Sequence, residues 1–123
     1  MAQRSVQGSV SYHAGQSAEL CVASEYERRG YSIARRRWRG AGGEVDLIAR
    51  NADGLVFVEV KKSSSFAQAA ARISRRQMDR ICISAAAFLE QEPDGQLTNM
   101  RFDAALVDRA GSIEIVENAF GLG

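Results

Sequence analysis

The sequence predicts a single α/β domain. Two segments, one near the N-terminus and one in the second half of the chain, have the apolar spacing of amphipathic helices. Between and after them lie runs rich in β-branched and aromatic residues, bounded by turn-forming residues, as in β-strands. A chain of 123 residues with 46% hydrophobic content has room for one core only. We therefore expect one domain at residues 13–123, after a flexible, polar leader at residues 1–12.

The first helix is expected from about Ala14 to Arg29, with Gly30 as its C-terminal cap. Glu19 lies within its apolar stripe, three residues before Val22 and seven before Tyr26. A carboxylate that faces a core needs a partner. Glu19 is therefore predicted either to support a metal site or to form a buried ion pair with an arginine.

The first strand is expected from Tyr31 to Trp38, followed by a glycine-rich turn at residues 40–43. Arginines crowd this strand and the start of the second helix. A basic face of this kind either contacts a phosphate backbone or is a solvated surface. The residues that we assign to a nucleic-acid-binding face are Arg35, Arg37, Arg39 and Arg76.

A β-hairpin is the central prediction. Residues 43–50 and 55–61 have strand composition, and the polar stretch between them has turn composition. Asp46, Glu59 and Lys61 interrupt these apolar runs, where burial without partners would be costly. Side chains alternate between faces, so a loop of Ala52-Asp53, or of residues 51–54, would place Asp46 opposite Glu59 with Lys61 on the same face. A loop of Asp53-Gly54 would instead place Lys61 opposite Asp46, with all three still on one face. A loop of three residues would separate them.

Two neighbouring carboxylates cannot both stay ionised cheaply unless a cation lies between them. Ligation by Asp46, Glu59 and the Val60 carbonyl, all through oxygen, suits Mg²⁺ or Mn²⁺. Lys61 would orient the attacking water, help to deprotonate it and offset negative charge on a phosphate. The pattern indicates metal-assisted hydrolysis of a phosphodiester. The alternative is a structural salt bridge, in which Lys61 neutralises one of the acids.

The rest of the chain is expected to complete the sheet and cover it. A serine-rich loop at residues 62–68 leads into a second helix that begins at about Ala69 or Ile73 and ends at Glu90. Strands follow at residues 101–108 and 113–116. Within the first of these strands, Asp103 is expected to form a buried ion pair with Arg101 or another arginine.

Several classes of protein are disfavoured by the composition. The only histidine is His13, and Cys21 and Cys82 are isolated, so Ser-His-Asp catalysis and a structural zinc site are not expected. No signal peptide or apolar run of membrane length is present, which predicts a cytoplasmic protein without membrane contact.

The hairpin residues resemble the YraN family of small bacterial proteins, which belongs to the restriction-endonuclease-like, PD-(D/E)xK nuclease superfamily. The likeness is carried by Gly43-Glu44-Val45-Asp46-Leu47-Ile48 and by Val56-Phe57-Val58-Glu59-Val60-Lys61. Gly15 with Ala18-Glu19, Arg101-Phe102-Asp103 and Asn118-Ala119-Phe120 also match the family pattern.

This resemblance implies an αβββαβ core with a mixed central sheet flanked by helices, in a single nuclease-like domain. It implies an active site of Asp46, Glu59 and Lys61 supported by Glu19, as in the archaeal Holliday-junction resolvases. Gln77 would support the site from the second helix. The implied substrate is nucleic acid, with DNA favoured and branched or junction forms included, and the resolvases' pairing allows a homodimer. The competing interpretation is a nucleic-acid-binding module that kept the fold without turnover.

Overall fold

The computed structural model describes residues 14–120. The leader predicted at residues 1–12 lies outside the described residues. No helix in the described part of the chain has the length and apolarity that a membrane crossing requires. The elements, in chain order, are α2 (Ala14–Arg28), β1 (Ser32–Gly40), β2 (Gly43–Asn51), β3 (Gly54–Lys62), α3 (Phe66–Ala71), α4 (Arg75–Leu89), the 3₁₀ turn η1 (Gly95–Leu97), β4 (Met100–Val107) and β5 (Ile113–Phe120).

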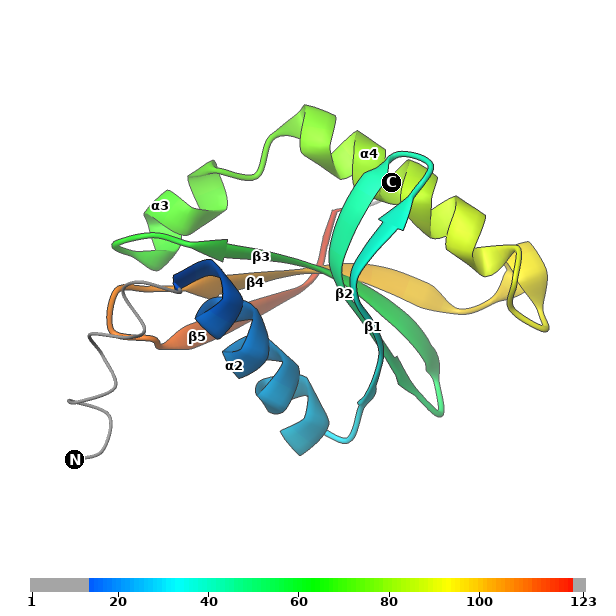
Figure 1. Cartoon of the computed structure of the whole chain (residues 1–123), viewed down its shortest axis with the longest axis horizontal. Helices are drawn as coiled ribbons and strands as arrows, with labels where there is room; N and C mark the ends of the chain where they lie inside the picture. The colour runs from blue at the N-terminus through cyan, green and yellow to red at the C-terminus, as the bar shows by residue number, and fades with distance from the viewer. Residues whose placement is uncertain (1–13, 121–123) are drawn as a thin grey trace.

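The strands form one mixed sheet in the order β1-β2-β3-β4-β5. Only β3 and β4 pair in parallel, and α3 and α4 provide the crossover between them. Helix α2 lies on one face of the sheet, and α3 and α4 lie on the other (Figure 1). The predicted α/β class with a mixed sheet flanked by helices is therefore confirmed. The element order is compatible with a restriction-endonuclease-like core, to which β5 adds an edge strand.

Each face of the sheet has its own apolar core. On the α2 face, Val22 and Tyr26 pack in a cluster with strand residues such as Val58. On the α4 face the cluster is rich in aromatic side chains, and Phe88 makes edge contacts with both Trp38 and Phe57. Burial of such side chains typically stabilises a fold by about 1.5–3 kcal/mol each. The two cores hold α2 and α4 on opposite sides of the central hairpin.

The central hairpin closes with a two-residue loop, Ala52-Asp53, between paired Asn51 and Gly54. Asn51 Oδ1 accepts hydrogen bonds from the backbone N–H of both Asp53 (2.9 Å) and Gly54 (3.2 Å), which holds the turn. Gly54 has φ +148°, a backbone conformation that residues with a side chain rarely adopt. This loop is one of the two predicted to bring Asp46 opposite Glu59.

The prediction of a serine-rich loop and a single helix after the hairpin was wrong. Strand β3 continues to Lys62, and two helices follow rather than one. The reason is that two serines are helix N-caps: Ser65 Oγ accepts a hydrogen bond from the Gln68 N–H, and Ser74 Oγ accepts one from the Gln77 N–H. Serines outside an apolar pattern resemble loop residues in a sequence, although here they start α3 and α4.

A buried serine ties α4 to the turn between β1 and β2. The Ser84 hydroxyl donates to the Gly43 carbonyl at 2.8 Å and accepts from the Gly42 N–H at 3.0 Å. Gly42 lies so close to α4 that a Cβ atom there would be 2.2 Å from the Arg80 carbonyl oxygen. The close approach fixes the beginning of β2, and with it Glu44 and Asp46, relative to α4.

Candidate active site

A cavity of about 330 Å³ lies between α2 and α4, at the end of β3, and charged side chains make up much of its lining. Acids line it from α2, β2 and β3, and bases line it from β3 and α4. All four predicted catalytic residues and Gln77 are among its lining residues. The lining comprises Ala18, Glu19, Gly42, Gly43, Glu44, Asp46, Glu59, Val60, Lys61, Lys62, Gln77, Arg80 and Ile81.

The hairpin register explains why Asp46 and Glu59 meet. Strand pairing runs from Asn51↔Gly54 to Leu47↔Val58, so Asp46 and Glu59 are the next position along. There the ladder gives way to a side-chain contact, because Asp46 Oδ2 accepts a hydrogen bond from the Val60 N–H at 2.8 Å. The predicted ligand Val60 therefore lines the cavity and also holds Asp46 in place.

Glu59 is the most buried acid of the cavity, with 3% of its surface exposed. Its Oε2 atom accepts a hydrogen bond from Gln77 Nε2 at 2.5 Å and forms an ion pair with Lys61 Nζ at 3.0 Å. Gln77 thus contacts a predicted catalytic carboxylate from α4. Both partners hold Glu59 at one orientation inside the cavity.

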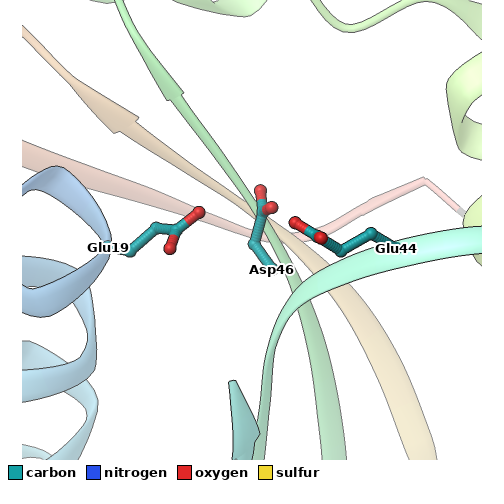
Figure 2. A group of neighbouring side chains, drawn as sticks. All are labelled: Glu19, Glu44 and Asp46. Atoms are coloured by element: carbon teal, nitrogen blue, oxygen red, sulfur yellow. The ribbon is translucent and has the colours of Figure 1, made fainter. Parts of the chain in front are cut away.

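Asp46 also belongs to a second set of acids, formed with Glu19 and Glu44. One carboxylate oxygen from each lies within 4.8 Å of the others. Figure 2 shows Glu19 reaching from α2 toward Asp46, and Glu44 pointing toward it from the opposite side. Sequence reasoning did not assign Glu44 to the site. The available signal was its spacing, because Glu44 and Asp46 occupy alternate positions on one strand.

Burial and mutual repulsion make these carboxylates difficult to ionise. Burial raises the pKa of Glu59 to about 8, and the Asp46 charge acts in the same direction. Burial is also the main cause that raises the pKa of Asp46, although the Val60 N–H and Lys61 oppose it. Burial and the Asp46 charge raise the pKa of Glu19. Without a cation, the cavity therefore disfavours the charged forms of these carboxylates, chiefly through burial and further through repulsion between them.

These features fit a hard divalent cation. The donors are carboxylate oxygens, which Mg²⁺ and Mn²⁺ prefer, and they converge on one place from different elements. A cation there would lower the raised pKa values of the acids. Glu19, Glu44 and Asp46 would hold it from different directions, and Glu59, which the hairpin register places across from Asp46, lines the same cavity.

The four arginines predicted to bind nucleic acid have different surroundings. All four are exposed. Arg35 Nη1 donates to the Ala34 carbonyl, Arg39 pairs with Glu44 in the strand register, and Arg76 lies in the first turn of α4. Arg37 Nε lies 3.4 Å from Glu19 Oε1. Lys62 and Arg80, which sequence reasoning left unassigned, line the cavity itself.

The raised pKa of Glu59 predicts how stability depends on pH without a cation. A carboxyl with a folded pKa of about 8, against an ordinary value of 4.5, stabilises the fold most below pH 4.5. That contribution is lost as the pH rises through 8. We expect the melting temperature in EDTA to fall across this range, and Glu59→Gln to reduce the fall by on the order of 5 °C.

Thermal unfolding followed by circular dichroism from pH 5 to pH 9 checks this prediction. Glu114→Gln, a change of an exposed glutamate on β5, is the matched control and should follow the wild type. An equally steep fall in Glu59→Gln and the wild type would contradict the assignment to Glu59.

Comparison with known proteins identifies the family. Residues 18–107 match the model of a family described as "Uncharacterised protein family UPF0102". The chain belongs to the UPF0102 family. This match confirms the resemblance to YraN-like proteins at the level of the family. The UPF0102 match includes every residue that lines the cavity, and it ends with β4.

Individual UPF0102 proteins match over almost their whole length. One from Cereibacter sphaeroides strain KD131 is 63% identical over 113 residues, which cover 92% of this chain and 97% of the relative. One from Ruegeria pomeroyi is 60% identical over 116 residues, with 94% of each chain covered. One from Dinoroseobacter shibae is 43% identical over 115 residues, covering 94% of this chain and 86% of the relative.

Proposed function

We propose that this UPF0102 protein is a nuclease that hydrolyses phosphodiester bonds in nucleic acid with the help of Mg²⁺ or Mn²⁺. The observation that carries the proposal is the convergence of Asp46, Glu59 and Lys61 in one cavity. These are the residues that the PD-(D/E)xK resemblance names as the active site. DNA is the favoured substrate, including branched or junction forms.

In the proposed reaction, the acids of the cavity would bind the cation and Lys61 would act on the attacking water and the phosphate. Asp46 and Glu59, with Glu19 and Glu44, would bind the cation. When bound, the cation would polarise the phosphate and lower the pKa of the attacking water. Lys61 Nζ, beside Glu59 Oε2, would orient that water and stabilise charge that develops on the phosphate oxygens.

Two further contacts would support these steps. Gln77, through its hydrogen bond to Glu59 Oε2, would keep that carboxylate turned into the cavity. Lys62 and Arg80 add positive charge to the lining of the cavity. These two side chains would bind phosphates adjacent to the scissile one, because a nucleic-acid strand presents a row of such charges.

The test is a cleavage assay on single-stranded, duplex, flap and four-way-junction DNA. Cleavage is expected with Mg²⁺ or Mn²⁺ and none in EDTA. Ca²⁺ should support binding with little turnover, because its looser coordination positions water poorly. Asp46→Asn should lose both Mn²⁺ binding and cleavage.

The matched control is Asp53→Asn. It makes the same chemical change at the exposed turn of the same hairpin, outside the cavity, and should cut as the wild type does. If the wild type binds these substrates but cuts none with either metal, the protein is instead a non-catalytic nucleic-acid-binding module. If Asp53→Asn loses as much activity as Asp46→Asn does, the loss of cleavage in Asp46→Asn is no evidence that the cavity is the active site.

A further inference from the structure

Arg37 has an unusual backbone conformation for a strand residue. Its φ is +48°, and among residues 14–120 the only other residue besides glycine with a positive φ is Asn118. Asparagine adopts this left-handed conformation readily, whereas a long side chain such as that of arginine does so at an energetic cost. Strain of this kind persists only where the surroundings impose it, and it is often found at functional sites.

In this conformation, the Arg37 side chain contacts an acid that lines the cavity. Arg37 lies between Arg36, which pairs with Leu47, and Trp38, which pairs with Val45, so it is beside Asp46. Its Nε atom reaches Glu19 Oε1 on α2, at 3.4 Å. Glu19 is one of the three acids that converge at Asp46. Strand β1 therefore brings a positive charge to the acids of the cavity.

The contact has the properties of a pair that can exchange partners. The 3.4 Å separation exceeds the usual length of an N–H···O hydrogen bond. The side chain of Arg37 is 54% exposed, and solvent weakens an ion pair at such a position. The guanidinium opposes the rise in the pKa of Glu19 that burial and Asp46 cause. It thus partly neutralises the acids that a divalent cation would bind.

We propose that Arg37 is an exchangeable counter-ion of the acid cluster, a role that rests on the nuclease function proposed above. Without a cation, the Arg37 guanidinium pairs with Glu19 and competes for that carboxylate. Once a cation engages Glu19, the guanidinium is released and turns to a phosphate of the substrate. Arg37 is then a positioning residue that couples cation binding to substrate binding, rather than one member of a uniform basic face.

The test uses the full chain with Arg37→Asn. Asparagine retains the left-handed backbone and removes the charge, so the variant separates charge from strain. Titration calorimetry with Mn²⁺ alone at low ionic strength should show binding about three- to tenfold tighter than in the wild type, because a competing cation is gone. The matched control is Arg109→Asn, which removes one exposed arginine from the turn between β4 and β5, outside the cavity, and should leave Mn²⁺ affinity unchanged. In a Glu19→Gln background, Arg37→Asn should no longer tighten Mn²⁺ binding.

A second measurement tests whether the released Arg37 guanidinium contacts a phosphate of the DNA. Binding of a short DNA duplex, measured against salt concentration, should have a steeper log-log slope in Ca²⁺ than in EDTA, by about one unit if one more phosphate contact forms. Arg37→Asn should lose that increment, and Arg109→Asn should keep it. Unchanged or weaker Mn²⁺ binding in Arg37→Asn overturns the counter-ion role and leaves the nuclease proposal standing. A wild type that binds no Mn²⁺ overturns both.

Discussion

Lys61→Ala should lower the rate of cleavage by about 100- to 1,000-fold at saturating Mn²⁺ and substrate. Lys61 Nζ lies 3.0 Å from Glu59 Oε2, and only 18% of the lysine side chain is exposed. A positive charge held in this largely buried position would act on charge that develops as the phosphodiester is attacked. Its contribution would be greatest in the transition state, so its loss should lower the rate more than substrate affinity.

The measurement is a single-turnover time course, with Mn²⁺ and DNA binding determined separately. Removal of Lys61 also removes a partner of Glu59, so Mn²⁺ must be raised until the rate no longer depends on it. Lys62→Ala is the matched control, because Lys62 lines the same cavity on the next residue of β3. We expect Lys62→Ala to weaken DNA binding with little effect on the saturated rate. Equal rates for Lys61→Ala and the wild type would mean that the cleavage activity originates elsewhere.

The parts of the fold that follow from local patterns could be predicted from the sequence. The central hairpin was predictable because its two runs of strand residues flank a short polar turn, and only a few loop lengths fit. Alternation then fixed which side chains share a face, which brought Glu59 and Lys61 together. The first helix could be placed because Gly30, with φ +97°, ends it.

The parts that depend on contacts between distant elements could not be predicted. Strand alternation puts Glu44 on the same face as Asp46, but the meeting of both with Glu19 of α2 depends on how the elements pack, including the contacts of Ser84 that hold the beginning of β2 against α4. The contact of Arg37 with Glu19 depends on a left-handed residue inside a strand, for which an arginine gives no signal. Arg80 likewise reaches the cavity only through the packing of α4 on the sheet.

A second polar centre, on the α2 face of the sheet, surrounds the fully buried carboxylate of Asp103 and belongs to the fold rather than to the cavity. The Asp103 carboxylate accepts hydrogen bonds from Tyr26 Oη (2.6 Å), from Arg101 Nε (2.8 Å) and Nη2 (3.1 Å), and from the Asn118 N–H (3.0 Å). The ion pair predicted between Asp103 and Arg101 is confirmed. The same carboxylate joins α2 to β4 and holds β5 where its pairing with β4 shifts register.

Asp103→Ala should therefore lower the free energy of unfolding by about 3–5 kcal/mol, because it leaves a partly buried guanidinium, a buried phenol and a backbone N–H without their acceptor. Urea denaturation at pH 7 measures the loss. If that variant does not fold, Tyr26→Phe removes a single donor and should cost about 1–2 kcal/mol. The matched control is Glu117→Gln, because Glu117 also pairs with Arg101 (3.4 Å) but is 58% exposed, and its loss should cost less than about 1 kcal/mol. Similar losses for Asp103→Ala and Glu117→Gln would mean that burial of the carboxylate does not determine its contribution.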